Sequence, residues 1–513
     1  MAKLYEYQSK ALFEKGGISI PRGGHAKTKE EAIKIANEIG WPVVIKAQAW
    51  VTGRAQAGGI RFAQDPAEAE KIADQILGMD IKGFKVREIL VEEKLDIERE
   101  FYIGMIIDDV AKCPLLIFSS MGGTGIEEIA GKYPDKLVRF PIDITTGLKD
   151  FEAKNMLVRL EIRGELQTSL SDTLVKFYHV CRKCEARSAE INPLVLTKQG
   201  QIIAVDSHII IDDYAVFRHP ELGIEIAREF DRPPTELEKV AYQVEAKDHR
   251  GTFYFLQMEQ KITPRSGTIG FHGGGGGGSM MSMDALLSQR FKIANYCDTS
   301  GNPSASKVYR AARIILSQKN IDGYFASGSG VASQEQFHSA RGLVKAFREV
   351  YLNIPAVIRI GGNSEELAME ILHTYTKDLP GRVEAYGRDT SAVFCAKRLR
   401  DLVSHWDYSQ KVHSHEFQKK PQPSSYGFDT MTGKLFIDHE KCKTCGNKPC
   451  VDSCAAQILK FDDEKPVLSI SHQEAKKGRC TECLACELAC QFHGNKAIII
   501  DLPILGLDKA VEA

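Results

Sequence analysis

Residues 268–287 read TIGFHGGGGGGSMMSMDALL and decide the fold of the middle of the chain. An apolar strand at 268–272 runs into six consecutive glycines, and a helix is predicted to begin near Ser279. Downstream, predicted strands alternate with predicted helices: Ser304–Leu316, Gly323–Ala326, Gln334–Val350, Ala356–Ile360 and Glu365–Tyr375. Such alternation is typical of an α/β fold with a parallel sheet covered on both faces.

The preceding segment, residues 1 to about 235, also alternates helices and strands. Its opening, MAKLYEYQSKALFEKGG, is typical of an amphipathic helix that ends at Gly16 and Gly17. The remaining predicted elements are a helix at Glu30–Ile39, strands at Pro42–Lys46, Ile89–Glu92 and Glu100–Ile107, a helix at Thr173–Glu185, and a hairpin of Leu194–Thr197 with Ile202–Asp206. A glycine-bearing loop, Gly53–Gly59, follows the first of these strands.

Eight of the thirteen cysteines form two runs near the end of the chain: Cys442, Cys445, Cys450, Cys454 and Cys480, Cys483, Cys486, Cys490. The second spacing, C-x2-C-x2-C-x3-C, is that of bacterial two-cluster ferredoxins, in which the fourth cysteine of each run binds the other cluster. One [4Fe-4S] cluster is therefore expected on Cys442, Cys445, Cys450 and Cys490. The second is expected on Cys480, Cys483, Cys486 and Cys454.

Two other interpretations of these cysteines fit less well. Zinc takes four ligands in two CxxC pairs, and a disulfide framework requires an oxidising compartment. The pattern also departs from the ferredoxin spacing in two ways: four residues separate Cys445 from Cys450, and no proline follows Cys454 or Cys490. A second CxxC spacing, Cys181 and Cys184, lies inside a predicted helix and is interpreted as two buried thiols.

Bulk composition limits the other possibilities. A chain of 513 residues predicts two to four domains. The 67 basic and 68 acidic residues nearly cancel, which gives no reason to expect nucleic-acid binding. No apolar run is long enough to span a membrane, and the N-terminus does not resemble a leader, so a cytoplasmic location is expected. The expected domains are 1–235, 236–402 and 431–513, with a polar linker at 403–430.

Residues 1 to about 400 resemble the β subunit of succinyl-CoA synthetase, an ADP-forming acid–CoA ligase. Residues 4–18, LYEYQSKALFEKGGI, match the opening of that family, and Gly53–Gly59 matches its glycine-rich loop. Glu190–Val195 matches the EINPL motif, and Gly361–Asn363 falls where the family has a glycine–asparagine pair. The resemblance implies an ATP-grasp domain, then a flavodoxin-like parallel α/β CoA-ligase domain, with a small α+β ferredoxin-like domain at the end.

The resemblance also implies a nucleotide site. Lys46 is expected to place a charge on a phosphate, and the loop with Gly53, Arg54 and Ala55 is expected to present backbone N–H groups to phosphate oxygens. Glu92 and Glu100 are expected to line the site for ATP or GTP. Asn192 and Asp206 match the magnesium ligands of the family, an oxygen pair suited to a hard cation.

The second domain departs from the family where the substrate carboxylate is held. His272 stands at a family methionine position and Gly274 at the position of an asparagine. In the loop that begins at Gly330, Ser333 replaces an arginine. Losing an amide and a guanidinium removes carboxylate recognition, so an acid other than succinate is expected. The glycines admit either a bulkier acid or a flexible loop, and His272 is interpreted as a packing or substrate contact, not a phosphate acceptor.

The resemblance also implies a partner subunit for the complete ligase reaction. In the resembling enzymes ATP phosphorylates a histidine of a separate α subunit, which also binds CoA, so a partner of that kind is expected. The first hypothesis is thus an acid–CoA ligase subunit whose ferredoxin module exchanges electrons with an oxidoreductase. The second is an ATP-gated electron-transfer subunit, and the third is a docking platform with structural cysteines.

Overall fold

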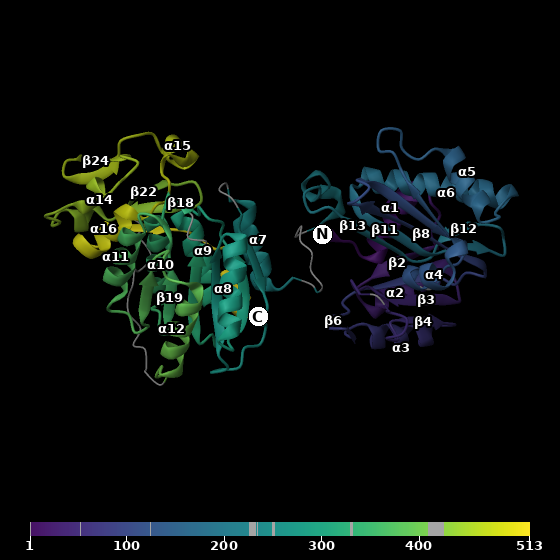
Figure 1. Cartoon of the computed structure of the whole chain (residues 1–513), viewed down its shortest axis with the longest axis horizontal. Helices are drawn as coiled ribbons and strands as arrows, with labels where there is room; N and C mark the ends of the chain where they lie inside the picture. Colours follow the sequence, from purple (N-terminus) through teal and green to yellow (C-terminus); the bar gives the residue numbers. More distant parts are fainter. Residues whose placement is uncertain are drawn as a thin grey trace. The chain divides into compact units, whose positions relative to one another are not determined.

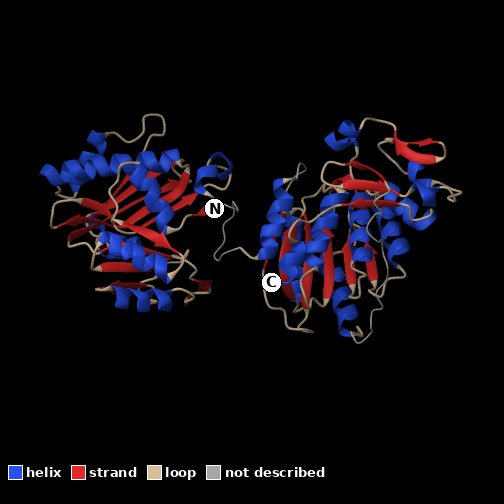
Figure 2. Cartoon of the chain, turned by 180° about the vertical axis from the view of Figure 1, so that it is seen from behind, coloured by secondary structure: helices blue, strands red, loops and turns tan. Residues whose placement is uncertain are grey.

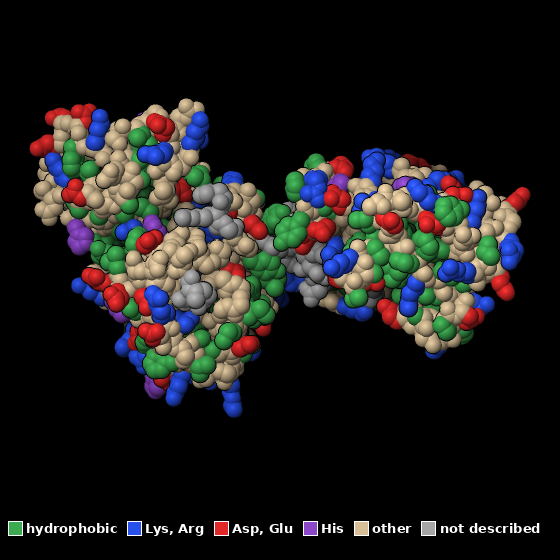
Figure 3. Space-filling model, turned by 45° about the horizontal axis from the view of Figure 1, so that its top comes forward, with side chains coloured by type: hydrophobic (Ala, Val, Ile, Leu, Met, Phe, Trp, Pro, Cys, Tyr) green, Lys and Arg blue, Asp and Glu red, His purple; other side chains and the backbone are tan. Residues whose placement is uncertain are grey.

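The computed structural model describes residues 2–51, 53–123, 125–224, 232, 234–248, 252–328, 332–408 and 425–512. The chain divides into two compact units, Met1–Pro234 and Thr235–Ala513, which are described separately (Figure 1). Figure 2 shows that both units contain helices and strands. No helix in these ranges has the length and apolarity that a membrane span requires. Acidic and basic side chains are interspersed on the faces drawn in Figure 3.

The first unit is built on a large antiparallel sheet. Its strand order is β1-β13-β11-β8-β9-β10, with β12 beside β11. The strands are β1 (Ala2–Lys3), β8 (Ile97–Asp108), β9 (Cys113–Ser119), β10 (Leu137–Pro141), β11 (Ala186–Thr197), β12 (Ile202–Ala204) and β13 (Ser207–Ile211). Helices α1 (Glu6–Lys15), α5 (Asp150–Arg159) and α6 (Gly164–Lys183) pack their apolar side chains against this sheet. The predicted hairpin is confirmed by the pairing of Leu194 with Ala204.

A smaller antiparallel sheet completes this unit, in the order β2-β7-β3-β4. Its strands are β2 (Gly23–Ala26), β3 (Val43–Ala47), β4 (Ile60–Ala63) and β7 (Ile89–Glu93), and it packs with α2 (Lys29–Ile39) and α3 (Pro66–Ile76). The remaining elements are α4 (Ile126–Lys132) and the short strands β5 (Asp80–Ile81) and β6 (Phe84–Lys85). The N-terminal helix begins later than predicted, because Ala2 and Lys3 pair with Ile211 and Ile210 as a strand.

The second unit confirms the α/β class expected from the sequence. Its six-stranded sheet has the order β14-β16-β15-β17-β19-β21, and only the β14–β16 pair is antiparallel. The strands are β14 (Tyr254–Gln257), β15 (Thr268–Gly274), β16 (Lys292–Asp298), β17 (Gly323–Gly328), β19 (Ala356–Arg359) and β21 (Val383–Tyr386). Two short strands, β18 (Ala332–Glu335) and β20 (Gly362–Asn363), pair beside it.

Helices cover both faces of this parallel sheet. One face carries α8 (Gly276–Ser288) and α12 (Ala392–Ser404), and the other carries α9 (Ala305–Leu316), α10 (Phe337–Glu349) and α11 (Glu365–Thr376). Helix α7 (Glu236–Ala246) packs against β14 and α9. Helix α8 starts within the glycine run, earlier than predicted. Gly273 is required at the end of β15, since a Cβ there would lie 2.1 Å from Ser279 Oγ.

The cysteine-bearing part of the chain, residues 425–512, is called the C-terminal module here. It contains β22 (Tyr426–Asp429), β23 (Lys434–Ile437) and β26 (Ile498–Asp501) in one sheet, and β24 (Leu459–Asp462) with β25 (Lys465–Leu468) in another. Its helices are α13 (His439–Cys442), α14 (Pro449–Asp452), α15 (His472–Glu474), α16 (Ala485–His493) and α17 (Leu507–Glu512). Of the predicted linker, 409–424 lie outside the described residues, and Tyr426–Asp429 form a strand instead.

The C-terminal module shares one hydrophobic core with α9, α10 and α11 (Figure 1). Lys345 of α10 and Glu487 of α16 form an ion pair of 2.8 Å, and each side chain is only 1% exposed. Phe492 stacks on Tyr375 of α11 with ring centroids 4.1 Å apart. Arg310 of α9 donates to the carbonyl oxygens of Thr432 and Pro503 at 2.9 and 3.2 Å. The module is therefore packed into the second unit and is not a separate body at the end of a linker.

Lys345→Met is expected to destabilise the second unit by roughly 3–5 kcal/mol, because it leaves the Glu487 carboxylate buried without its cation. Urea unfolding followed by circular dichroism measures the change. The matched variant Lys345→Met with Glu487→Gln removes that charge but keeps the oxygen that accepts from the Ile500 N–H at 3.0 Å. This double variant should recover most of the lost free energy of unfolding. Equal unfolding midpoints for wild type and Lys345→Met would contradict this role of the ion pair.

Candidate functional site

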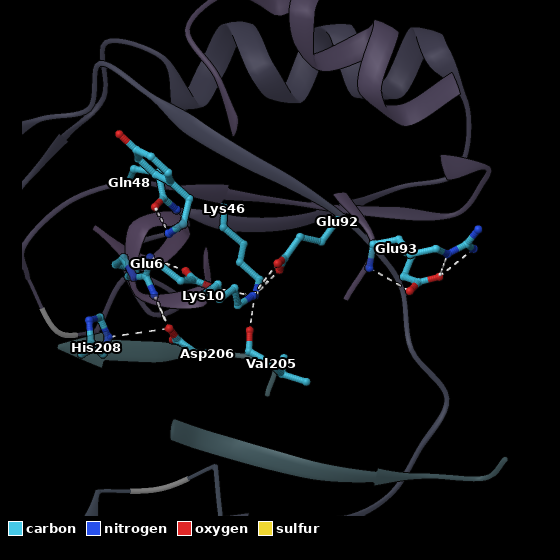
Figure 4. Close-up of polar contacts among 12 residues, drawn as sticks. Glu6, Lys10, Lys46, Gln48, Glu92, Glu93, Val205, Asp206 and His208 are labelled. Atoms are coloured by element: carbon cyan, nitrogen blue, oxygen red, sulfur yellow. Dashed lines mark hydrogen bonds and ion pairs between the residues drawn. The ribbon is translucent and has the colours of Figure 1, made fainter. Parts of the chain in front are cut away.

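Lys46 of β3 lies in a buried group of charges in the first unit (Figure 4). Its side chain is 5% exposed, and its Nζ lies 2.9 Å from Glu6 Oε1 and 2.8 Å from Glu92 Oε2. The ammonium also donates to the carbonyl oxygen of Val205 at 2.7 Å. Two of the residues expected at the nucleotide site, Lys46 and Glu92, are thus in direct contact.

Arg54 joins the glycine-bearing loop to the expected magnesium ligand Asp206. Its NH2 group lies 2.8 and 2.9 Å from the two carboxylate oxygens of Asp206. Its NH1 group lies 2.7 Å from Glu6 Oε2 and donates to the carbonyl oxygen of Ala47 at 3.0 Å. Gly53 and Ala55, on either side of Arg54, are exposed. The loop therefore turns one buried guanidinium inward and leaves its backbone at the surface.

Glu6 and Lys10 complete this group, and sequence reasoning missed both. Lys10 Nζ lies 3.0 Å from Glu6 Oε1 and also contacts Glu92. Three cations (Lys10, Lys46, Arg54) thus face three carboxylates (Glu6, Glu92, Asp206). The only signal in the sequence is the (i, i+4) spacing of Glu6 and Lys10 in the opening helix, which is common on exposed helix surfaces as well.

Electrostatics keep this buried group ionised. Burial pushes the pKa of Glu6 upward, but Lys10, Lys46 and Arg54 together hold it well below its usual value. Burial alone would lower the pKa of Lys46, whereas the Glu6 and Glu92 carboxylates raise it above its ordinary range. The group therefore holds fixed charges of both signs at neutral pH.

Asn192 and Asp206 are neighbours at the edge of the same group. The backbone N–H of Asn192 donates to the carbonyl oxygen of Asp206 at 3.0 Å. The side-chain oxygen of Asn192 accepts from the Gly123 N–H at 2.9 Å. The Glu100 carboxylate lies against the same glycine, since a Cβ on Gly123 would lie 2.2 Å from Glu100 Oε2. The structure thus brings the oxygen donors of Asn192, Asp206 and Glu100 to one region of the first unit.

A second candidate site is a pocket in the second unit at the carboxyl ends of β15, β17 and β19. Ligands of open parallel sheets bind at this edge. The pocket is lined by His272, Gly273, Gly274, Thr299, Ser300, Gly301, Pro303, Val308, Ala326, Ser327, Gly328, Ala332, Gln336, Ser339, Leu343, Ile358, Arg359, Ile360 and Gly361. It is called the acid pocket below. Gly330 lies outside the described residues.

His272 lies in the wall of this pocket as a neutral, hydrogen-bonded side chain. Its Nδ1 lies 2.6 Å from the Tyr324 hydroxyl and its Nε2 lies 3.1 Å from Thr299 Oγ1. Burial lowers the pKa of His272 to about 4. Both ring nitrogens are thus engaged by neighbouring hydroxyl groups.

Arg359 is a pocket residue that the sequence interpretation missed. It stands at the end of β19 and donates to the carbonyl oxygens of Gly328, Arg388 and Thr390. Ser333, which replaces the family arginine, instead accepts from the Asn302 amide at 3.0 Å. The feature of the sequence that could have predicted Arg359 is the position of this charged residue at the end of an otherwise apolar strand.

A third candidate site lies in the C-terminal module. Four thiols and a mainly apolar wall line one cavity there: Cys454, Cys480, Cys483 and Cys486 with Phe428, Leu435, Ala456, Ile458, Leu459, Thr481, Glu482, Leu484 and Ile500. The electrostatic neighbours of Cys450 are Cys490 and Cys442, and Cys445 is a neighbour of Cys490. The eight thiols thus separate into two groups, each with three members of one run and the fourth of the other.

All cysteines are free thiols, and Cys181 and Cys184 are buried as expected. Across the described ranges, no three His, Cys, Asp or Glu side chains are arranged to hold one metal ion.

Comparison with known proteins relates most of the chain to two families. The ATP-grasp domain family matches residues 3–196. The β subunit of GDP-forming succinate–CoA ligase from Thermus thermophilus is 38% identical over 369 residues, which cover 72% of this chain and 93% of that protein. The β subunit of ADP-forming succinate–CoA ligase from Chloroflexus aurantiacus is 36% identical over 387 residues, covering 75% of this chain and 97% of that protein. About a quarter of this chain therefore has no counterpart in it.

The fold is also similar to that of a solved structure. ATP citrate lyase from Methanothrix soehngenii, in complex with citrate and coenzyme A, aligns with a TM-score of 0.65 and 18% identity. The alignment covers 78% of this chain and 99% of that one. At this identity the likeness shows a common fold and nothing finer.

Glu6→Gln is expected to reduce the acid sensitivity of the first unit. Because the folded-state pKa of Glu6 lies below its ordinary value of 4.5, its ionised form stabilises the fold above that pH, and the contribution is lost as the pH falls further. At neutral pH the variant should lose roughly 3–5 kcal/mol of stability. Thermal unfolding between about pH 6 and about pH 3 measures both effects. Glu38→Gln, an exposed change on α2, is the control, and an equal pH dependence for both variants would refute the assignment.

Proposed function

Because this chain belongs to the family of succinate–CoA ligase β subunits, we propose that it binds the nucleotide in an acid–CoA ligase that acts through a phosphohistidine on a separate α-like subunit. The C-terminal module adds two [4Fe-4S] clusters for electron transfer. The observation that carries the nucleotide assignment is the buried group of three cations beside Asn192 and Asp206. One relative is named GDP-forming and the other ADP-forming, so the nucleotide is either ATP or GTP.

The charges of the first unit suit a triphosphate. Lys46 and Arg54 supply cations for phosphate oxygens, and the exposed backbone around Gly53 and Ala55 supplies N–H donors. Asn192 and Asp206 carry the amide and carboxylate oxygens that would hold magnesium, which would neutralise charge on the phosphates. Arg54 engages both oxygens of Asp206, so a bound phosphate would compete with Asp206 for this guanidinium.

The acid pocket supports a substrate other than succinate. Among its lining residues Arg359 is the one cation at neutral pH, since His272 is neutral, and the position of the family arginine holds Ser333. A single guanidinium matches a single carboxylate, whereas succinate carries two. We infer an acid with one carboxylate and a larger apolar or neutral remainder beside the glycines of this pocket.

An α-like partner would supply the phosphohistidine and most of the CoA-binding site. His272, the histidine that lines the acid pocket, is buried and neutral, so the phosphohistidine is proposed on the partner, which would also bind most of the CoA. Helices α8 and α12 pack together and expose large apolar side chains: Met280, Met281, Leu287, Val393 and Phe394 are each 48–73% exposed. An apolar patch of this kind supports a subunit interface.

The two groups of thiols fit two cubane clusters. Each thiolate of a [4Fe-4S] cluster binds a different iron, so four thiols lining a cavity suit a cluster even where no three converge on one ion. The grouping of Cys442, Cys445, Cys450 and Cys490, apart from Cys454, Cys480, Cys483 and Cys486, matches the crossed pairing expected from the spacing. The clusters would supply one-electron transfer, with an oxidoreductase as the partner.

The ligase proposal is tested by measuring the release of ADP or GDP. The chain is purified with its α-like partner and given ATP or GTP, CoA and a panel of carboxylic acids. Acid-dependent release of ADP or GDP is expected, and Lys46→Met should reduce it about 10²–10³-fold because a phosphate loses its cation. Lys34→Met, on the exposed side of α2, should leave the rate unchanged. Nucleotide-dependent reduction of the clusters without any thioester would instead favour the ATP-gated electron-transfer function.

The clusters are tested by anaerobic iron analysis and electron paramagnetic resonance. Wild type should hold iron for two cubanes. Cys454→Ala should remove the signal of one cluster and Cys490→Ala that of the other, because each residue completes the opposite run. Cys395→Ala, a buried free thiol of α12, should leave both signals unchanged. Iron for fewer than two cubanes, or both variants affecting the same signal, would overturn the assignment.

A further inference from the structure

Helix α10 separates the acid pocket from the cysteine cavity of the C-terminal module. Gln336, Ser339 and Leu343 line the acid pocket. Positions 341, 345 and 348 lie on the opposite side of the helix, because they differ from the first set by about half a turn. Lys345 on that side contacts Glu487 of α16, so the second side faces the module. One helix therefore has the pocket on one side and the thiols on the other.

The module-facing side of α10 carries three cations, and two of them have carboxylate partners. Lys345 pairs with Glu487 and Glu349, each at 2.8 Å. Arg348 pairs with Asp378 at 2.7 Å. In the part of the chain that the structure describes, no carboxylate lies within ion-pair distance of Arg341. Arg341 instead lies over the Phe337 ring at 4.6 Å.

Arg341 lies about one turn before Lys345, whose partner Glu487 directly follows Cys486, and its electrostatic neighbours are Cys483, Cys486 and Tyr375. Burial lowers the pKa of its guanidinium, while Cys483 and Cys486 act in the opposite direction. Both cysteines line the cavity with Cys454 and Cys480. A half-buried cation without a carboxylate is costly, and four thiolates around a cluster supply the missing negative charge.

We propose that Arg341 is the charge partner of the cluster held by Cys454, Cys480, Cys483 and Cys486, and that it raises the reduction potential of that cluster. This inference rests on the proposed clusters. Reduction adds one electron to the cluster and no proton, so a fixed positive charge nearby stabilises the reduced form. Arg341 thus acts on the cluster through its fixed positive charge and does not bind an iron.

The same placement brings this cluster near the acid pocket, because the thiols that would hold it lie beside α10. Only the width of this helix, about 10 Å with its side chains, then separates it from the acid pocket. The ligase pocket and the redox centre are in this way coupled through one element whose two sides they occupy.

The test is a redox titration of the complete chain, followed by electron paramagnetic resonance, with the two signals assigned by Cys454→Ala and Cys490→Ala. Arg341→Gln should shift the reduction equilibrium of the second cluster at least tenfold toward the oxidised form, about 59 mV for a one-electron couple. The other cluster should keep its potential. Arg341→Lys retains the charge and should stay close to wild type. Lys397→Gln, which removes an exposed charge from α12 on the opposite face of the sheet, should change neither potential.

The outcomes separate this inference from the function on which it rests. Absence of both signals in wild type would refute the clusters. Two clusters with unchanged potentials in Arg341→Gln would refute the role of Arg341 and leave the clusters standing. Equal shifts in Arg341→Gln and Arg341→Lys, or loss of the second cluster from both, would show that packing and not charge is responsible.

Discussion

The second unit depends on the burial of helix α10 from all sides. Ser339, Ala340 and every residue from Gly342 to Arg348 are buried, although Lys345 and Arg348 carry charges. A buried ammonium is tolerated only with an anionic partner, and Glu487 of α16 supplies it for Lys345. Because Glu487 directly follows Cys486, the sequence that holds the thiols also balances the charge of the central helix. Module and sheet consequently stabilise each other.

In the first unit, buried carboxylates likewise balance buried cations. A triphosphate needs several cations in one place, yet three cations without counter-charges would repel one another in a buried site. Glu6 contacts Lys10, Lys46 and Arg54, and Glu92 and Asp206 share the remaining contacts. The carboxylates keep the cations together and charged, as the proposed binding of a triphosphate requires. In that proposal a phosphate must compete with the carboxylates for the cations.

The sequence predicted local features well and distant contacts poorly. Periodicity placed α9, α11 and β19 within one residue at each end, since these elements are regular and bounded by clear turns. The first residues, predicted as helix, form β1 because their partner strand lies more than two hundred positions away. The pairing of Lys345 with Glu487, 142 positions apart, has no local signal either. Motif resemblance predicted Lys46, Asn192 and Asp206 as site residues, and this stays a prediction, whereas Glu6 and Arg359 were found only from their contacts in the structure.

The buried charges of the C-terminal module indicate that it is matched to the second unit and is not merely attached to it. A module joined only through a linker would close its own core with apolar and satisfied polar groups. Here the two glutamates within the second run are both buried: Glu482 accepts from Thr430 and Thr432 of the turn that Arg310 binds, and Glu487 pairs with Lys345. In a free module Glu482 would keep these donors, but Glu487 would lose its cation, and a buried carboxylate without its partner is costly. The cysteine run is thus fitted through Glu487 to α10, one of the helices that cover the parallel sheet.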